Sequence, residues 1–456
     1  MNTLIAIIGL GVLCLLFEIF NLRKAIVPIS IVGLLAVLGL TVSEFGLAES
    51  YYNNMIVVST FSSAFSALFI VLTIFLVALG HNFYENNQTK ISDFIAIKIF
   101  LLAGAVAMVS FGNLAMFFLG IEVLSIALYV LAASDRMNLK SNEAGMKYFL
   151  MGSFASGIIL FGICLIYGAM GSFDVVEITQ LSRSAELPVW FPIGIVLLTI
   201  GMLFKVAAVP FHFWAPDVYE GSPALTTALM STLAKVVAMA TLYKLLAVMN
   251  ADMTESFKLI VVVIAMASMT VGNVMALIQF NVKRMLAFSG ISHAGFMLMT
   301  LLNLDGSAGS LLYYASAYSL AGMAAFSVLL YVCKNKDDED MVHFHGLGKT
   351  NPILAAILTA SLLSMAGIPI FAGFFAKLVL FSNVISGGYI ALVIVAVLNS
   401  IISVGYYFKL ILAMYTKESN EERKGAPVII YAVAITAIVL NIALGLFPSL
   451  VLDILA

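Results

Sequence analysis

Long apolar runs alternate with short polar connections along almost the whole chain. Each run has about 20 residues, the length with which a helix crosses the hydrocarbon core of a bilayer. Strands of a membrane barrel would instead alternate apolar and polar residues, so the pattern predicts a polytopic all-α membrane protein. The fourteen expected spans cover approximately residues 3–20, 25–43, 55–80, 94–111, 113–133, 146–168, 190–210, 223–249, 256–280, 285–303, 308–333, 352–386, 389–415 and 427–450.

The positions of Lys and Arg orient these spans. With the N-terminus outside, the inner connections hold fourteen Lys and Arg residues, and the outer connections hold only Arg183 and Lys258. Positive charge collects in cytoplasmic connections, and an error of one span would have scrambled the asymmetry. The sequence therefore predicts that both termini face the periplasm or its equivalent.

The composition agrees with a lipid environment. Hydrophobic residues make up 62% of the chain and charged residues 10%, whereas soluble domains have about 45–50% and about 25%. The net charge is −2 and no stretch is strongly basic, so no nucleic-acid partner is expected. The first apolar run lacks a basic segment before it and a small-residue cleavage site after it, which favours a retained helix over a signal peptide.

Two of the expected spans contain an internal proline. Pro210 and Pro369 each break a helix, because proline lacks the N–H and clashes with the preceding turn, and a lysine lies near each break, Lys205 and Lys377. Paired interrupted spans indicate a transporter built from inverted repeats. We therefore expect broken spans 7 and 12 in two inverted five-helix repeats. The expected organisation is a three-helix segment (1–93), a first repeat of spans 4–8 (94–249), a second repeat of spans 9–13 (250–415) and a C-terminal helix (416–456).

Four ionisable residues lie deep within these spans: Glu122, Lys205, Lys235 and Lys377. A charged residue at the bilayer centre costs about 2.5–3.5 kcal/mol on insertion scales, so each position needs a reason. Glu122 could be a protonated carboxyl that only joins two helices, and Lys205 could extend to a helix end. Lys235 is about 12 residues into its span, too far from either interface for that explanation.

Lysine is suited to proton transfer in such positions. Burial disfavours its charged form, whereas a nearby carboxylate favours that form, so a buried lysine can load and release a proton near neutral pH. Arginine stays protonated, and none is found beside the central lysines. The choice of lysine indicates titration rather than a fixed charge.

Other polar residues have simpler interpretations. Lys98, Lys244 and Lys409 lie near helix ends, where snorkelling is expected. His212 and His293 lie beside membrane segments, and each is either a hydrogen-bonding residue of the packed helices or a functional residue. Cys14, Cys164 and Cys333 are far apart in apolar helices, so we expect no cysteine-ligated cluster in this chain. His343 and His345 fit a solvated loop better than a metal site, and no metal or cofactor site is expected.

Several stretches match one known group of proteins. They are Leu119–Glu122, Glu143–Tyr148, Lys205–Gly221, Lys283–His293 and Ala366–Pro369. These stretches resemble the antiporter-like membrane subunits of proton-pumping NADH:quinone oxidoreductase, respiratory complex I, which are related to the Mrp cation/proton antiporters. The resemblance extends over residues 94–410 and is strongest to subunits of the N type, in part because Lys377 occupies a position where M-type subunits have glutamate.

The resemblance implies roles for the polar residues. Glu122 and Lys205 would form the input pair for protons, Lys235 the relay and Lys377 the exit. The supporting residues that it implies are Glu143, Lys147, His212, Lys283, Ser292 and His293.

The resemblance also implies a setting. The chain would be a translocase subunit in a bacterial inner membrane, beside an M-type subunit and small membrane subunits. NADH, FMN, Fe–S clusters and quinone would be bound by other subunits, with no cofactor in this chain. Two alternatives stay open, an Mrp-type cation/proton antiporter subunit and a purely structural subunit.

Overall fold

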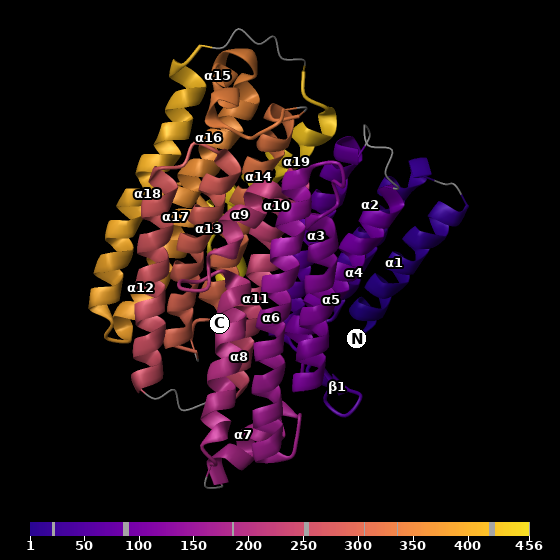
Figure 1. The fold of residues 1–456 in the computed structure, drawn as a ribbon, viewed down its shortest axis with the longest axis vertical. Coiled ribbons are helices and arrows are strands. Elements are labelled where there is room, and N and C mark those ends of the chain that lie inside the picture. The colour runs from indigo at the N-terminus through magenta and orange to yellow at the C-terminus, as the bar shows by residue number, and fades with distance from the viewer. Residues whose placement is uncertain are drawn as a thin grey trace.

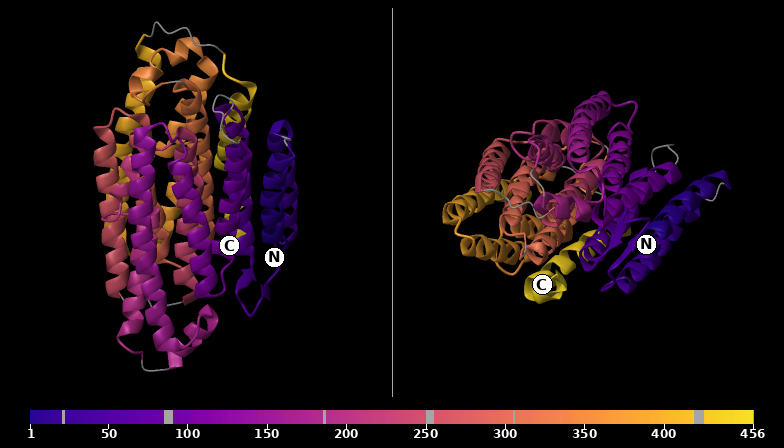
Figure 2. Two further views of the ribbon diagram at one scale, coloured as in Figure 1. Left: turned by 45° about the vertical axis from the view of Figure 1, so that its right-hand side comes forward. Right: turned by 90° about the horizontal axis from the view of Figure 1, so that it is seen from below.

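The computed structural model describes residues 1–20, 23–84, 91–184, 187–249, 255–304, 306–334, 336–418 and 425–455. Long helices run side by side along the longest axis and form one elongated bundle (Figure 1). The first two helices lie at one edge of this bundle (Figure 2). The two termini lie toward the same end of the bundle, in agreement with an even number of crossings.

The N-terminal segment has three long helices and a hairpin. Its elements are α1 (Asn2–Ile19), α2 (Arg23–Ser43), β1 (Glu49–Tyr51), β2 (Ile56–Val58) and α3 (Thr60–Tyr84). The strands pair in antiparallel register, with Glu49 opposite Val58. The hydropathy pattern did not predict this hairpin, because two strands of three residues carry too short a period to separate from a polar connection.

The central part of the chain divides into two successive groups of helices. The first contains α4 (Ile91–Ser110), α5 (Leu114–Ala132), α6 (Leu139–Met170), α7 (Val175–Ser184), α8 (Trp190–Val206), α9 (Trp214–Gly221), α10 (Ala224–Leu229), the π-helical turn η1 (Met230–Ala234) and α11 (Lys235–Met249). The second contains α12 (Glu255–Leu277), α13 (Val282–Leu298), η2 (Met299–Leu302), α14 (Ala308–Val332), η3 (Met341–Phe344), α15 (Leu347–Thr350), α16 (Pro352–Ala366), α17 (Ala372–Ser386) and α18 (Ile390–Thr416). The chain then ends with α19 (Val428–Leu446), α20 (Ser449–Leu452) and η4 (Asp453–Leu455).

These helices confirm the predicted all-α membrane fold. Among the described residues, twelve helices are long and apolar enough to cross a membrane by length and composition. Three shorter apolar helices, α8, α16 and α17, have 10–17 residues and occupy the two spans predicted to be interrupted. The total of fourteen spans and their grouping into repeats stay predictions.

Both predicted helix breaks are present. Helix α8 ends at Val206 and α16 ends at Ala366. The next residue has a left-handed backbone at each place, with φ of 61° at Ala207 and 89° at Gly367. After each, a backbone N–H turns back to a carbonyl five residues earlier, from Ala208 to Leu203 and from Ile368 to Leu363, both at 3.0 Å. This arrangement satisfies part of each helix end, while other carbonyls stay open to side chains.

A lysine late in each group caps the first helix of that group. The Nζ of Lys244 in α11 donates to the carbonyl of Val109 at 2.7 Å, near the end of α4. The Nζ of Lys409 in α18 donates to the carbonyl of Gln279 at 3.1 Å, just past the end of α12. Each ammonium also lies over an aromatic ring, Phe111 at 4.7 Å and Phe280 at 4.1 Å.

The second helix of each group begins in the same way. The side chain of Asn113 accepts from the Met116 N–H at 2.8 Å at the start of α5. The side chain of Asn281 accepts from the Arg284 N–H at 3.0 Å at the start of α13. Each asparagine also forms an isolated β-bridge with an aspartate that follows the third long helix, Asp174 or Asp340. The two groups therefore share local contacts although their sequences differ.

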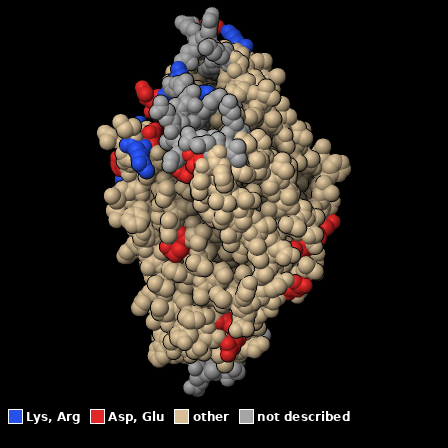
Figure 3. All heavy atoms as spheres, turned by 90° about the vertical axis from the view of Figure 1, so that its right-hand side faces the viewer, with Lys and Arg blue, Asp and Glu red and all other residues tan. Residues whose placement is uncertain are grey.

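Charge is distributed unevenly over the surface. On the face shown in Figure 3, Lys and Arg gather toward the upper end, whereas the broad lower part shows scattered Asp and Glu among uncharged residues. Many large apolar side chains are exposed, among them Phe154, Phe213 and Ile401 at 74%, 70% and 64%. Such a surface suits a lipid or protein environment and not water.

Candidate functional site

Lys205 lies in the last turn of α8 and points to hydroxyl groups of neighbouring helices. Its Nζ donates to Ser125 Oγ at 2.6 Å, to Tyr129 Oη at 3.4 Å and to Ser156 Oγ at 3.5 Å. These partners belong to α5 and α6. The ammonium is therefore held inside the first group of helices, and snorkelling does not describe it.

Glu122 lies one turn before Ser125 on the same face of α5. Residues three apart are neighbours on a helix surface, so the carboxyl is close to the hydroxyl that binds Lys205. Its Oε1 atom is buried and has no hydrogen-bond partner within the described part of the chain. The alternative of a simple hydrogen bond between helices has no support at Oε1.

Lys235 is the first residue of α11 and directly follows the π-helical turn η1. Its side chain is 2% exposed, and among the described residues no hydrogen-bond partner reaches Nζ. Opposite it, a Cβ added to Gly290 would lie 2.9 Å from Nζ and 3.0 Å from Tyr318 Oη. The missing side chain of Gly290 leaves space for the lysine, and the Tyr318 hydroxyl lies 3.3 Å from Ser231 Oγ.

His293 connects several hydroxyls in the core of the second group. Its Nδ1 is 2.8 Å from Tyr314 Oη and its Nε2 is 3.3 Å from Tyr407 Oη. Tyr407 also forms a short hydrogen bond with Ser289. Because both ring nitrogens have hydroxyl partners, the tautomer can change without loss of a hydrogen bond.

Lys377 lies in α17 on the far side of the second break. Its side chain is 5% exposed, and Nζ donates to the carbonyls of Ala366 at 2.9 Å and Met365 at 3.2 Å. Both carbonyls belong to the last turn of α16, where the break leaves them without helix partners. The ammonium also lies 4.9 Å from the centre of the Phe296 ring.

A cavity of about 10 Å³ lies between Lys377 and His293. It is close to the smallest space that holds one water molecule. The residues that line it come from α13, α14, α16 and α17. The lining residues are His293, Tyr314, Ala317, Tyr318, Ser364, Met365, Gly373, Ala376 and Lys377.

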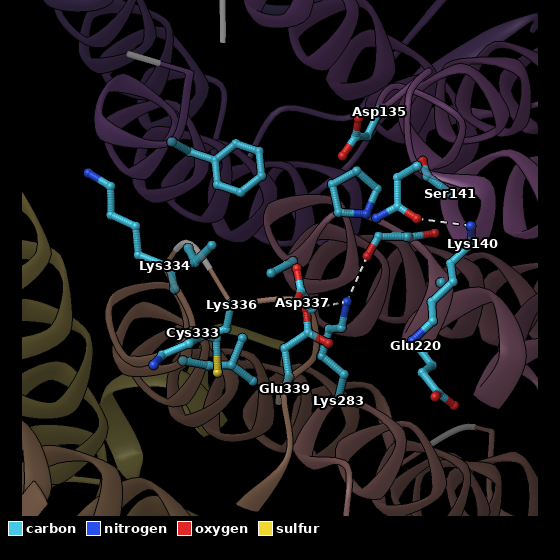
Figure 4. A pocket seen from close by; sticks show the side chains of 18 of the residues that line it. Asp135, Lys140, Ser141, Glu220, Lys283, Cys333, Lys334, Lys336, Asp337 and Glu339 are labelled. Atoms are coloured by element: carbon cyan, nitrogen blue, oxygen red, sulfur yellow. Dashed lines mark hydrogen bonds and ion pairs between the residues drawn. The ribbon is translucent and has the colours of Figure 1, made fainter. Parts of the chain in front are cut away.

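A larger polar cavity of about 300 Å³ opens where the two groups of helices meet at one end (Figure 4). Its charged lining residues are Asp135, Lys140, Glu220, Lys283, Lys334, Lys336, Asp337 and Glu339. Lys283 is 3% exposed, and its Nζ binds Glu339 at 2.7 Å and the carbonyl of Ser222 at 2.9 Å. On α13, Lys283 precedes Gly290 by two turns, so this helix links the cavity to the surroundings of Lys235.

Comparison with known proteins identifies the family. Residues 112–403 match the family described as "NADH:quinone oxidoreductase/Mrp antiporter, TM". The chain is 76% identical to the NADH-quinone oxidoreductase subunit N of Flavobacterium johnsoniae, over 100% of both chains. The chain belongs to the NADH-quinone oxidoreductase subunit N family.

Solved structures agree with this family. A chain of respiratory complex I from Thermus thermophilus with bound aureothin has a TM-score of 0.86 and 30% identity, covering 100% of this chain and 99% of that one. A chain of the Mrp complex from Dietzia has a TM-score of 0.86 but 22% identity, covering 99% and 94%. The second likeness concerns the fold alone.

Other residues expected to support the site are spread over the subunit N fold. Glu143 and Lys147 form an exposed ion pair on α6 at 2.7 Å. Ser292 is buried where α12 and α13 come close together at Gly272. His212 lies between α8 and α9, is 7% exposed, and its Nδ1 has no hydrogen-bond partner in the described ranges.

An ion-pair network that single residues did not reveal joins α6, α9 and α13. Lys147 Nζ lies 3.4 Å from Asp217, which binds Arg284 at 2.8 Å, and Arg284 binds Glu220 at 2.9 Å. The sequence offered one indication, since Asp217 and Glu220 belong to the stretch that carried the family resemblance. The network ties the short helix α9 to both groups.

The snorkelling interpretation is wrong for two lysines of this subunit N family member. Lys98 is 1% exposed and Lys244 is 8% exposed. A position near a helix end suggested that both could reach an interface, but neighbouring helices cover them. Nine residues, or two and a half turns, separate Lys244 from Lys235. The two lysines therefore lie on opposite faces of α11, and Lys244 points toward α4.

Proposed function

We propose that this chain transfers protons across the membrane as a subunit of NADH-quinone oxidoreductase. The observation that carries the proposal is Lys235, a buried lysine without a hydrogen-bond partner among the described residues, in a space opened by Gly290. An amine in this position gains little from staying charged. It is suited to change its protonation when a neighbouring charge changes.

The proposed route has four members. Glu122 and Lys205 form the input pair, in which Ser125 and Tyr129 receive the ammonium when Glu122 is neutral. Lys235 is the relay between the two groups of helices. Lys377 is the exit, reached from the centre through His293 and one bridging water in the small cavity. A water with several hydroxyl partners suits this role.

The supporting residues have separate proposed roles. Lys283 forms the floor of the large cavity, which we assign as the inner mouth for protons. His212 lies at the first break and would respond to Lys205. Glu143 and Lys147 stabilise α9 through Asp217, and Ser292 maintains the close packing of α12 and α13. A hydrogen bond to a carbonyl near a helix end is common to Lys377, Lys283 and Lys244. This bond alone therefore does not distinguish a lysine that transfers protons from one that only caps a helix. The other groups around each lysine make that distinction.

Two inverted repeats are the proposed architecture. The shared lysine caps, asparagine caps and helix breaks support repeats over 94–249 and 250–415, after a three-helix segment (1–93) and before a C-terminal segment (416–456). Five helices per repeat place the second repeat upside down in the bilayer. Fourteen spans follow if α8–α9 and α16–α17 each count as one broken span.

The proposed setting is a bacterial inner membrane. The excess of Lys and Arg in the connections on one side supports a cytoplasmic location for that side and periplasmic termini. An M-type subunit and small membrane subunits are the proposed neighbours. NADH, FMN, Fe–S clusters and quinone are assigned to other subunits of the complex, which perform the redox chemistry. An Mrp-type role has weaker support, since that likeness is limited to the fold.

Substitution of the central lysines tests the proposal. Complexes that carry Lys235→Ala or Lys377→Ala are reconstituted in vesicles, and proton uptake per NADH oxidised is compared with wild type after assembly is checked. We expect a loss of about tenfold or more in proton uptake with both. Lys409→Ala, which removes a capping lysine, is the control and keeps normal uptake. Normal uptake in the Lys235→Ala complex would favour a purely structural subunit.

A further inference from the structure

The C-terminal helix α19 packs directly against the second helix break. Its buried residues include Asn441 and Gly445, one turn apart and therefore on the same face. A Cβ added to Gly445 would overlap the carbonyl oxygen of Ile370 and lie 2.8 Å from the Ala372 nitrogen. Glycine thus allows backbone contact between α19 and the connection from α16 to α17.

Asn441 joins the break to a third helix. It is 0% exposed. Its Oδ1 accepts from Ser364 Oγ at 2.9 Å, and its Nδ2 donates to the carbonyl of Ala317 in α14 at 2.9 Å. Ser364 Oγ in turn accepts from the Gly373 N–H at 3.4 Å. One asparagine therefore fixes the last turn of α16 and the first turn of α17 relative to α14.

This link ends beside the ammonium of Lys377. The two carbonyls that receive Nζ belong to Met365 and Ala366, the residues directly after Ser364. Ser364 and Lys377 also line the same small cavity together with His293. A shift of Ser364 would move the carbonyls that hold the lysine and change the space between Lys377 and His293.

The first break has a related support. The Val209 N–H donates to Ser268 Oγ of α12 at 2.9 Å. In both cases a polar side chain holds the break, and it comes from the long helix that lies two spans later in the chain. Helix α19 lies outside the proposed repeats, but it supplies a polar side chain to the second break, as α12 does to the first.

We propose that Asn441 is a positioning residue for Lys377 and acts through Ser364. The inference rests on the proposed role of Lys377 in proton transfer. Asn441 itself touches neither Lys377 nor the small cavity in the described contacts. It sets the position of the carbonyls that receive the ammonium, so the C-terminal helix is part of the exit and more than a lipid-facing cover.

The test compares Asn441→Ala, Ser364→Ala and the double variant in assembled complexes in vesicles. We expect Asn441→Ala to lower proton uptake per NADH oxidised by roughly twofold to tenfold, the net effect of one hydrogen bond, and to change the pH profile of uptake. Since both residues act in one link, the double variant should lose no more than the stronger single variant. Val433→Ala, which trims another buried residue of α19, should leave uptake and its pH profile unchanged.

The outcomes separate this inference from the proposed function. If Lys377→Ala abolishes uptake while Asn441→Ala behaves like Val433→Ala, the positioning role is wrong and the exit role of Lys377 stands. If Lys377→Ala has no effect on uptake, the proposed role of Lys377 in proton transfer is wrong, whatever the result for Asn441→Ala. Should Asn441→Ala not assemble, Asn441→Asp replaces it, because it keeps the size and the acceptor for Ser364. Asn441→Asp places a titratable carboxyl in contact with Ser364, so the inference predicts that it changes the pH profile of uptake. An unchanged pH profile in this variant would also overturn the inference.

Discussion

The Nζ of Lys377 donates to the carbonyl oxygen of Ala366 at 2.9 Å, across the break between α16 and α17. In a continuous helix this carbonyl would receive a backbone N–H from the next turn. The break thus creates the acceptor, and the lysine from the other side of the break fills it. A change in protonation of Lys377 is therefore coupled directly to the geometry of a helix end.

Gly290→Ala tests the space around Lys235. The added Cβ would lie 2.9 Å from Lys235 Nζ and 3.0 Å from Tyr318 Oη, so the lysine must leave the space that it occupies opposite Gly290. We expect the complex to assemble and proton uptake per NADH to fall by about tenfold, because a misplacement of about 1 Å in a reacting group can cost up to about 10²-fold in rate. Gly157→Ala in α6 meets no atom within 4 Å and serves as the control. If the two variants show equal uptake, the space opposite Gly290 is not needed for the role of Lys235.

Ser125→Ala tests the input pair. It removes the 2.6 Å contact to Lys205 Nζ, and a hydrogen bond to a charged group contributes about 1.5–3 kcal/mol. Proton-coupled turnover should fall by about tenfold or more with normal assembly. Ser327→Ala is a matched control, since Ser327 is also buried and, among the described residues, its hydroxyl binds only the Met323 carbonyl of its own helix. A similar loss in both variants would point to packing and not to Lys205.

The sequence placed Lys205, Lys235 and Lys377 deep within membrane spans. Because burial of charge in lipid is costly, each such position is informative by itself. It did not predict their hydroxyl partners. Ser125 is of a type that often bonds to a carbonyl of its own helix, and Tyr129 is one aromatic residue in an apolar span, so neither partner of Lys205 leaves a pattern in the sequence. Lys98 and Lys244 were misjudged for a related reason. Position along a helix gives the distance to its end, whereas the neighbours that cover a side chain depend on packing.

The same limit applies to backbone features. Prolines 210 and 369 predicted both breaks, since their effect on a helix is local. The π-helical turn before Lys235 was not predicted, because one extra residue in a turn hardly changes an apolar pattern that is buried on all sides. Such turns are frequent at functional sites. The assignment of Gly445 and Asn441 to the second break required the tertiary structure.

Lys244→Met tests the distinction between a capping lysine and a conducting one. The substitution removes the donor to the Val109 carbonyl and leaves a buried acceptor unsatisfied, at a cost of about 1–3 kcal/mol. The complex should inactivate at lower temperature, while proton uptake per NADH at moderate temperature stays normal. Lys258→Met, which removes a lysine paired with the exposed Glu255, should change neither. A loss of uptake without a loss of stability would place Lys244 on a proton route.

Asp217→Asn tests the ion-pair network that holds α9. The carboxylate binds both Arg284 at 2.8 Å and Lys147 at 3.4 Å, and partly exposed pairs contribute about 0.2–1 kcal/mol each. We expect a modest fall in the thermal stability of the assembled complex at low salt. The difference from wild type should shrink at high salt, because ions screen exposed charges beyond about 3 Å at 1 M. Glu418→Gln breaks a pair with Lys349 whose side chains are 82% and 70% exposed, and it should have no measurable effect. If Asp217→Asn is equally silent at low salt, α9 is held by its aromatic packing, in which Tyr148 stacks on Trp214 at 4.6 Å, and the charges are incidental.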